Sequence, residues 1–323
     1  MISLSSSKLA FPGLGIDEFT LDKVAFTIFG RDVAWYGVII TTGIILAFLY
    51  VYLRTKKDGL LFDDLIDIAF FTVIPAIICA RLYYVIFYEL EHPGSYPDVH
   101  SVIAVWNGGL AIYGAIIGGA VSSYLVLKKK KVRIAKFFDA LAPAVMIGQI
   151  IGRWGNFVNS EAYGSETTLP WRMGVMEYGQ MIYVHPTFIY ESLWNLVGFI
   201  LINVFAKKKK YDGQLFFAYI SWYGFGRMLI EGLRTDSLMI GSSGIRVSQL
   251  IGFCCFIVGL FFFIYFAVKL RNKPIAQCIY TESSPNYKAP DTEAESSEKS
   301  EEAEANTDGK TDGDIGTEDD KNV

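Results

Sequence analysis

Arginines occur in this chain next to or inside segments that are otherwise apolar. Arg153 lies in the run GRWGNFVNSE (152–161), directly after the almost wholly hydrophobic segment 137–151. Placing a guanidinium in hydrocarbon costs about 2.5–3.5 kcal/mol on insertion scales. Because glycine, asparagine and glutamate surround this arginine, we expect Arg153 to bind an anion.

A second set of polar residues falls on one side of a predicted helix near 215–233. At about 100° per residue, the set covers a sector of about 80°; its members are Tyr223, Arg227, Glu231 and Arg234. Glu231 can pair with Arg227 four residues earlier and with Arg234 three residues later. The alternative is a self-neutralised ladder that only packs against a neighbouring helix.

Three more residues are candidates for the same site. Tyr36 opens the first apolar segment, and Arg81 lies near the end of the second. Arg81 either joins the site or extends to the membrane interface. Tyr113 lies at the start of the third apolar segment, which begins Asn107-Gly108-Gly109-Leu110 and continues through Gly114 to Gly118-Gly119. Small residues at this spacing allow helices to approach closely.

Arginines that converge from separate helices would form an anion site. The planar guanidinium donates two parallel hydrogen bonds, which suits a phosphate. We expect these residues to lie in the outer half of the membrane, where glycerophospholipid is the most available anion. The sequence has no P-loop, zinc-ligand spacing or GxSxG turn, so we expect neither a cofactor nor a metal.

The elements that must position these residues are membrane helices. Hydrophobic residues make up 52% of the chain and the mean hydropathy is +0.33. This composition predicts an all-α, polytopic bundle. We predict seven spans: Val33–Leu53, Ile66–Tyr88, Leu110–Leu127, Phe137–Ile151, Phe188–Phe205, Leu215–Leu233 and Val247–Val268.

The basic residues predict the orientation of the spans. Loops 89–109 and 160–187 hold only one of them, Arg172, whereas clusters follow the first, third, fifth and seventh spans: 54–57, 128–136, 207–210 and 269–273. This alternation predicts an external N-terminus and a cytoplasmic C-terminus. We interpret the lysine runs as topology determinants rather than nucleic-acid sites.

The domain organisation is a membrane domain followed by a tail. We predict an integral membrane domain over 1–273, with an outer cap around 160–187. Residues 276–323 contain 14 acidic and 4 basic residues, a net charge of −10, whereas the whole chain carries −4. Segment 274–323 is therefore predicted to be a disordered acidic cytoplasmic tail.

Four ordered motifs resemble one known family. The run 152–161 is similar to a motif of the bacterial phosphatidylglycerol–prolipoprotein diacylglyceryl transferases, and the resemblance extends over Phe29–Leu270. The other matching motifs are Asn107-Gly108-Gly109-Leu110, His185-Pro186-Thr187 with Tyr190-Glu191, and Tyr223-Gly224-Phe225-Gly226-Arg227 with Glu231 and Arg234.

The resemblance implies a transferase that catalyses the first step of lipoprotein maturation. It also implies a multi-pass protein of the bacterial plasma membrane. Such an enzyme moves the diacylglyceryl group of phosphatidylglycerol to the lipobox cysteine in a prolipoprotein signal peptide. A thioether forms and glycerol 1-phosphate leaves. A lipid- or anion-binding transporter is the alternative, although we find no internal repeat of the kind that transporters show.

The resemblance also implies roles for the candidate residues. Arg153 and Arg227 would hold the phosphate. The remaining candidates would orient Arg227 (Glu231, Arg234), order the loop and the headgroup glycerol (Asn156, Asn159, Glu161), or line the cavity (Tyr36).

Tyr113 departs from the family pattern, because many members carry histidine there. A tyrosine with a pKa of about 10 is a poor base at neutral pH. Tyr113 is then either a hydrogen-bond donor or a wall, or the thiolate forms by another route. Either Glu161 or the positive field of the arginines would then promote formation of the thiolate, and we favour the field. We interpret His185 as a helix-start residue.

Overall fold

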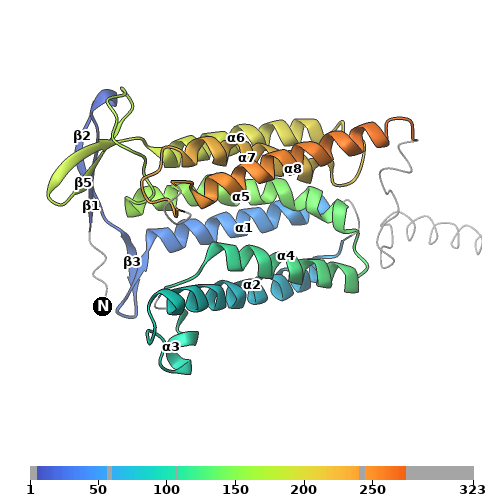
Figure 1. The fold of residues 1–323 in the computed structure, drawn as a ribbon, viewed down its shortest axis with the longest axis horizontal. Coiled ribbons are helices and arrows are strands. Elements are labelled where there is room, and N and C mark those ends of the chain that lie inside the picture. Colours follow the sequence, from blue (N-terminus) through green and yellow to red (C-terminus); the bar gives the residue numbers. More distant parts are fainter. Residues whose placement is uncertain (1–5, 57–59, 106–107, 240–243, 274–323) are drawn as a thin grey trace, which may run out of the picture.

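The computed structural model describes residues 6–56, 60–105, 108–239 and 244–273. The predicted acidic tail and Asn107 lie outside these ranges. We call the end of the helical layer that carries the strands the sheet end, and the opposite end, with Lys128–Lys131 and Lys207–Lys210, the lysine end (Figure 1).

Seven long helices coincide with the seven predicted spans. They are α1 (Trp35–Thr55), α2 (Phe62–Glu91), α4 (Ile112–Lys129), α5 (Ile134–Asn159), α6 (Thr187–Ala206), α7 (Gln214–Glu231) and α8 (Val247–Lys269). Five of them, α1, α2, α5, α6 and α8, are long and apolar enough to cross a membrane. A short helix, α3 (Val99–Ile103), precedes α4.

The ends of α5 and α7 differ from prediction in ways that change the placement of candidate residues. The fourth segment does not stop at Ile151, because α5 continues to Asn159. Arg153, Asn156 and Asn159 are therefore helical rather than part of a loop. Conversely, α7 ends at Glu231, with Gly232 as its C-cap. Arg234 therefore lies beyond the helix that was predicted to carry it.

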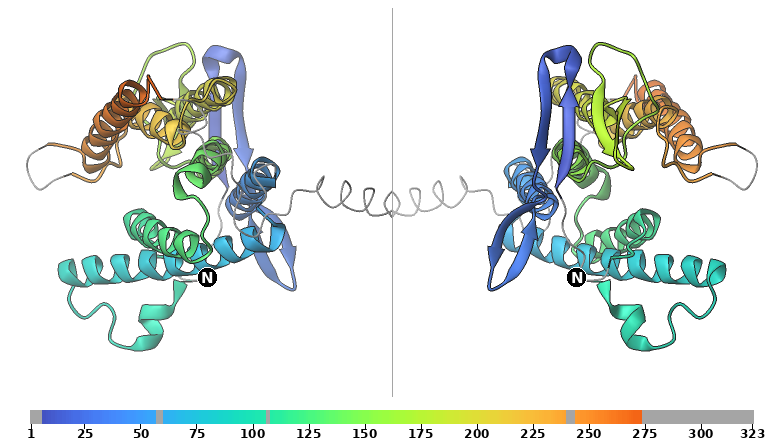
Figure 2. Two further views of the ribbon diagram at one scale, coloured as in Figure 1. Left: turned by 90° about the vertical axis from the view of Figure 1, so that its right-hand side faces the viewer. Right: turned by 90° about the vertical axis from the view of Figure 1, so that its left-hand side faces the viewer.

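Helix α5 is central, in contact with α1, α6 and α7. Helices α2 and α4 form a hairpin on one side, and α7 and α8 pair on the other (Figure 2). Glycines allow these close pairings, as the sequence indicates for α4. A Cβ on Gly114 would meet the Cys79 carbonyl oxygen at 2.4 Å, and one on Gly224 would meet that of Gly252 at 2.6 Å.

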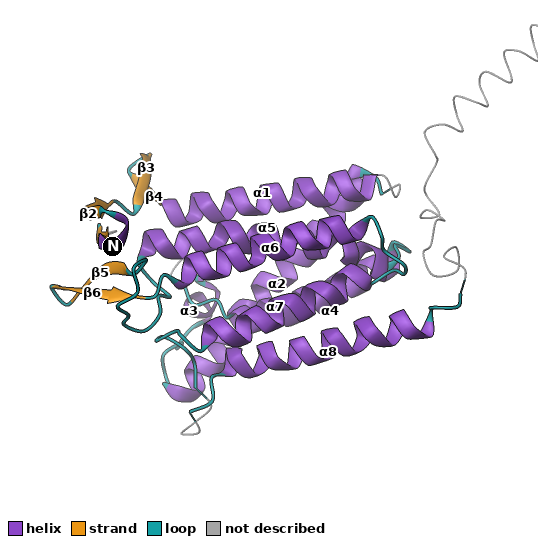
Figure 3. Cartoon of the chain, turned by 90° about the horizontal axis from the view of Figure 1, so that it is seen from above, coloured by secondary structure: helices purple, strands orange, loops and turns teal. Residues whose placement is uncertain are grey.

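The structure contains two small antiparallel sheets, so the expectation of an all-α fold is incomplete (Figure 3). One sheet has the order β2-β1-β5-β6, and the other pairs β3 with β4. Their strands are β1 (Ser7–Phe11), β2 (Ile16–Leu21), β3 (Val24–Ile28), β4 (Arg31–Ala34), β5 (Met173–Glu177) and β6 (Gln180–Val184).

The four-stranded sheet rests on the ends of α5 and α6. Leu9 of β1 lies opposite Val175 of β5, and both are buried in one apolar cluster with Phe188 of α6. The ring of Phe188 stacks on Phe157 of α5 with centroids 4.7 Å apart. This packing holds the segment between α5 and α6 over the residues around Arg153.

The lysine end is tied together by buried charge. Asp139 of α5 accepts hydrogen bonds from the backbone N–H groups of Gly213 (2.8 Å) and Phe216 (3.0 Å), and so caps the start of α7. Lys209 lies 3.0 Å from the same carboxylate and 2.7 Å from Asp212. Burial acts to lower the pKa of Lys209, but the two carboxylates outweigh it and the pKa is raised.

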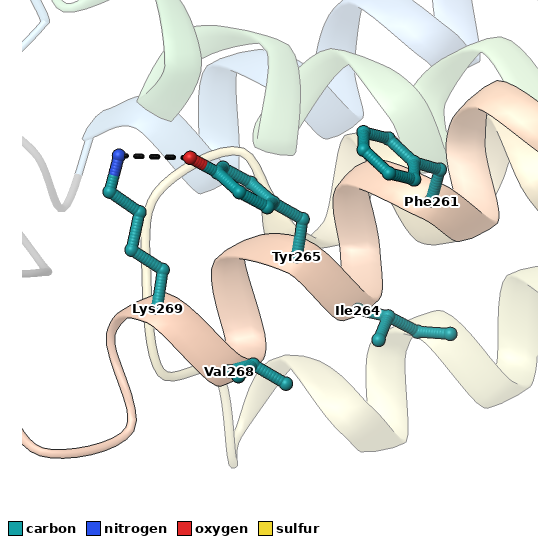
Figure 4. Close-up of a pocket in the computed structure, with 5 residues that line it drawn as sticks. All are labelled: Phe261, Ile264, Tyr265, Val268 and Lys269. Atoms are coloured by element: carbon teal, nitrogen blue, oxygen red, sulfur yellow. Dashed lines mark hydrogen bonds between the residues drawn. The ribbon is translucent and has the colours of Figure 1, made fainter.

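A shallow depression of about 380 Å³ lies on α8 near the lysine end (Figure 4). It is lined by Phe261, Ile264, Tyr265, Val268 and Lys269. The Lys269 ammonium donates a hydrogen bond of 3.1 Å to the Tyr265 hydroxyl. The other side chains are apolar and exposed, which is typical of a lipid-facing helix surface rather than of a catalytic cavity.

Candidate functional site

A buried glutamate lies at the centre of the arginine cluster. Glu191 of α6 is 4% exposed, and its carboxylate receives guanidinium groups from two other helices. Arg153 of α5 approaches it at 2.5 Å (Nη2–Oε2), and Arg227 of α7 approaches it at 3.0 Å (Nη1–Oε1). Three helices therefore converge on one carboxylate near the sheet end.

Arg227 is held by two carboxylates. Its Nη1 donates to both oxygens of Glu191, at 3.0 and 3.1 Å, and its Nη2 lies 2.7 Å from Glu231 Oε2. The predicted pairing of Arg227 with Glu231 is confirmed. Glu231 is 2% exposed, so the guanidinium plane is fixed between two buried anions.

The predicted pairing of Glu231 with Arg234 is wrong. Arg234 makes a bidentate contact with Asp236 instead, at 2.9 and 2.8 Å, and its Nη1 lies 4.0 Å from Glu191 Oε1. The cause is the end of α7 at Glu231, which turns Arg234 away from the helical stripe. Although burial acts to raise the pKa of Asp236, the bonds and charge of Arg234 lower it.

The six charged groups of this cluster balance. Arg153, Arg227 and Arg234 face three carboxylates, Glu191, Glu231 and Asp236. Each guanidinium has five N–H donors, and the contacts with these carboxylates use only some of them. The carboxylates thus orient the three guanidinium groups.

Arg153 also reaches toward the surface through its own helix. Its Nη1 donates to Asn156 Oδ1 at 3.1 Å, and Asn156 Nδ2 donates to Glu161 Oε1 at 2.8 Å. Asn159 is the last residue of α5 and is half-buried. The ring of Tyr36 lies against Gly155, where an added Cβ would meet it at 2.9 Å. Tyr36, Asn156 and Glu161 are therefore grouped beside Arg153, as the sequence predicts.

The segment after α5 is bonded to the segment after α7. The Ser165 N–H donates to the Leu233 carbonyl at 2.7 Å, and Thr187 Oγ1 donates to the Ala162 carbonyl at 2.5 Å. Because Leu233 precedes Arg234, this bonding also fixes the backbone next to that arginine. These bonds hold the loop around Glu161 and the start of α6 next to the arginine cluster.

His185 precedes α6, as predicted for a helix-start residue. Trp171 Nε1 donates to the Tyr190 hydroxyl at 2.7 Å, and that hydroxyl lies 3.2 Å from His185 Nδ1. Trp171, Tyr190 and His185 therefore form one hydrogen-bonded chain at the start of α6.

Tyr113 lies against the start of α8. Its hydroxyl lies 3.1 Å from Ser248 Oγ at the start of α8, so it links the α2–α4 hairpin to the α7–α8 pair. The neighbouring Gln249 donates to the Met228 carbonyl at 3.1 Å, one residue after Arg227. Tyr113 therefore approaches the cluster only through α8, in the contacts given for the described residues.

Arg81 serves the loop between α2 and α4. It is 6% exposed, and its guanidinium donates to four backbone carbonyls: Ser101 (2.8 Å), Val102 (2.7 Å), Gly108 (2.6 Å) and Gly109 (2.9 Å). A Cβ on Gly109 would lie 2.5 Å from Arg81 Nη1, which explains why the loop needs glycine there. The sequence left open whether Arg81 joins the anion site or extends to the membrane interface. In the structure its guanidinium binds the loop carbonyls instead.

Comparison with known proteins identifies the family. Residues 23–265 match the model of the family described as prolipoprotein diacylglyceryl transferase. The chain belongs to this family. It is 41% identical over 252 residues to the phosphatidylglycerol–prolipoprotein diacylglyceryl transferase of Clostridioides difficile (strain 630), and the alignment covers 78% of this chain and 98% of that protein. It is also 43% identical over 241 residues to that of Finegoldia magna, covering 74% and 94%.

No role for Glu191 was predicted from the sequence, although the structure places it at the centre of the arginine cluster. The signal was present, because Glu191 is an isolated acidic residue near the start of the predicted span 188–205. An ionisable residue within a membrane helix is by default a functional candidate with a partner. Asp236 was missed for a different reason, since it lies in a polar loop where acidic residues are common.

Proposed function

We propose that this chain transfers the diacylglyceryl group of phosphatidylglycerol to the lipobox cysteine of a prolipoprotein. The observation that carries the proposal is the meeting of Arg153 and Arg227 on Glu191, in a chain that matches the transferase family over 23–265. Two guanidinium groups fixed by buried carboxylates suit a phosphodiester whose negative charge grows as it leaves.

The reaction exchanges one bond at a glycerol carbon. The cysteine sulfur forms a C–S bond as the bond from that carbon to the phosphate oxygen breaks. Glycerol 1-phosphate departs with the bonding electrons, and the proton of the thiol passes to the leaving phosphate or to solvent. Catalysis therefore requires a thiolate, in-line alignment of sulfur and oxygen, and stabilisation of the departing phosphate.

Arg153 and Arg227 hold the phosphate in this proposal. Glu191 and Glu231 fix the guanidinium of Arg227, so that its free N–H groups point toward the leaving oxygen. Asn156, Glu161 and Tyr36 beside Arg153 line the headgroup glycerol, with Asn159 at the end of the same helix. Arg234, paired with Asp236, lies beside them, with its Nη1 4.0 Å from Glu191 Oε1.

Among the described residues, the charged side chains at the centre of the cluster are guanidinium groups and carboxylates. The positive field of the arginines is the route that we favour for activating the cysteine. Because three carboxylates offset the net charge of the cluster, this field would act locally, through guanidinium N–H groups close to the sulfur. Tyr113 contributes a hydrogen bond to Ser248 and a wall on the side of α8. Glu161 at the surface end of the Arg153 contacts is the second route.

The placement in the membrane follows from charge. Lysines gather at one end of the helices, where we place the cytoplasm, and the strands gather at the other. We infer seven spans, with α4 and α7 completing the five longest, and an external cap built from 160–187 and the N-terminal strands. The protein is then a multi-pass protein of the bacterial plasma membrane that receives the signal peptide of a secreted precursor.

The test uses the purified protein with phosphatidylglycerol and a peptide that bears a lipobox cysteine. Glycerol 1-phosphate release and the mass increase of the peptide are measured together, in the wild type and in Arg227→Ala. The proposal predicts equal amounts of both products and the loss of both in the variant. A folded wild type that produces neither, but moves solute across vesicles, would replace the transferase with the transporter.

A further inference from the structure

A second feature of the sheet end concerns the membrane rather than the reaction. Strands β3 and β4 form a two-stranded sheet of their own, separate from the four-stranded sheet. The hairpin contacts the helices through α1, and the Trp35 N–H at the start of α1 donates to the Lys23 carbonyl at 2.9 Å. An isolated two-stranded hairpin is marginally stable at best in water.

The two faces of this hairpin differ in polarity. Phe26 lies opposite Val33 and Ile28 lies opposite Arg31, so these side chains share one face. Thr27 and Asp32 occupy the other face, and the threonine hydroxyl donates to the aspartate at 2.7 Å. The apolar face is uncovered, since Phe26 is 47% exposed and Ile28 is 49% exposed.

The tip of the hairpin is also apolar. Phe29 and Gly30 both have positive φ, 50° and 73°, as in the tight turns that suit two-residue hairpins. A non-glycine residue with positive φ is uncommon, and asparagine is the more usual occupant. Phe29 nevertheless holds this place with its side chain fully exposed at 101%.

The position of the hairpin indicates what covers it. In Figures 1 and 2 it lies beside the sheet-end termini of the helices and at the edge of the bundle, next to α1. Few residues of helix α1 are buried, and it presents Ile44, Ile45 and Leu49 to its surroundings. The hairpin thus adjoins the start of a helix whose exposed side chains are largely apolar.

We propose that the β3–β4 hairpin lies in the bilayer interface at the sheet end, with Phe26, Ile28 and Phe29 among lipid chains. Aromatic residues favour this depth. Arg31, on the same face, has a long apolar stem and reaches back to the phosphate level. The hairpin would anchor the start of α1, and with it Tyr36 of the site. The proposal does not depend on the transferase activity.

The chain offers a matched control in the β5–β6 hairpin. Tyr178 and Gly179 form its tip with φ of 47° and 81°, and Tyr178 is 99% exposed. This second tip belongs to the four-stranded sheet and extends farther from the helix ends (Figure 1). Both tips therefore carry one exposed aromatic residue on the same type of turn, but at different distances from the helical layer.

The experiment places the photoreactive residue p-benzoyl-phenylalanine at position 29, and separately at position 178, in the full chain. Each variant is reconstituted in phosphatidylglycerol-containing nanodiscs without peptide, checked for wild-type thermal stability, irradiated, and analysed by mass spectrometry. The same residue at Thr27, on the polar face, tests whether one face is preferred.

We expect the phospholipid adduct at position 29 to be several-fold more abundant than at position 178, with an intermediate yield at Thr27. Equal yields at positions 29 and 178 would overturn the proposal. A cross-linked dimer at position 29 in place of a lipid adduct would assign the face to a second copy. An adduct that forms only when precursor peptide is added would assign it to the peptide, and either result would also overturn the proposal.

Discussion

Replacement of Arg227 by lysine separates charge from geometry. The guanidinium now contacts Glu191 with one nitrogen and Glu231 with another, at 3.0 and 2.7 Å. A lysine ammonium is a single point charge with no planar fork. It can stay near one of these carboxylates, but it cannot span both and still present donors to a phosphate.

The expected magnitude follows from the contacts that are lost. A hydrogen bond to a charged group contributes about 1.5–3 kcal/mol, and removing one donor that stabilises a developing anion costs about 2.7–4 kcal/mol. We therefore expect Arg227→Lys to raise the barrier by about 2–4 kcal/mol, or to slow turnover about 30- to 1,000-fold. Arg227→Ala should lose more, because it also leaves Glu231 buried without its cation.

The assay is the initial rate of peptide lipidation at saturating phosphatidylglycerol, with thermal stability measured on the same samples. Arg172→Lys is the matched control. Among the described residues, Arg172 donates to the Thr168 and Leu169 carbonyls and stacks over Tyr183. The control should stay within about threefold of the wild type, as is usual for a surface change. Wild-type turnover in a folded Arg227→Lys protein would refute the argument from bidentate geometry.

Further variants test the surrounding residues. Glu191→Gln removes the charge that two arginines share, and turnover should fall by about 10- to 100-fold with a lower melting temperature, because breaking a buried ion pair costs about 3–5 kcal/mol; an unchanged melting temperature would exclude this role. Tyr113→Phe and Ser248→Ala should each lose less than about tenfold, the worth of one neutral hydrogen bond, and a collapse in only the tyrosine variant would make its hydroxyl catalytic. Arg81→Ala should lower the melting temperature by leaving four carbonyls without their donor, whereas Arg81→Lys, which keeps some donors, should lower it less. The pKa of Asp236 is lowered from 3.8, so its ion pair is complete at neutral pH and is lost only as pH falls through that lowered value; the rate profile over roughly pH 5–8 should therefore keep its shape in Asp236→Asn.

The helices were predictable because hydropathy and glycine spacing are local properties. Each of the seven predicted spans coincides with a helix of the structure. The pairing of Arg227 with Glu231 was also predictable, since it depends only on helical periodicity. The grouping of Asn156 and Glu161 beside Arg153 follows from their closeness along the chain.

Contacts between distant segments could not be predicted in the same way. Leu9 pairs with Val175 across 166 residues, and no local pattern in β1 specifies its partner. Glu191 meets Arg153 and Arg227 only after three helices have packed. Arg81 presents the clearest case, because an arginine in an apolar segment has the same sequence context whether it binds phosphate, lipid headgroups or loop carbonyls.

The most direct test of the arginine cluster is an experimental structure with a phosphatidylglycerol analogue whose glycerol–phosphate oxygen bond is replaced by a non-cleavable one. The account predicts phosphate oxygens within about 3.2 Å of N–H donors on both Arg153 and Arg227, with Glu191 still contacting at least one of them. A phosphate bound elsewhere, with both arginines still fully engaged by Glu191 and Glu231, would contradict it.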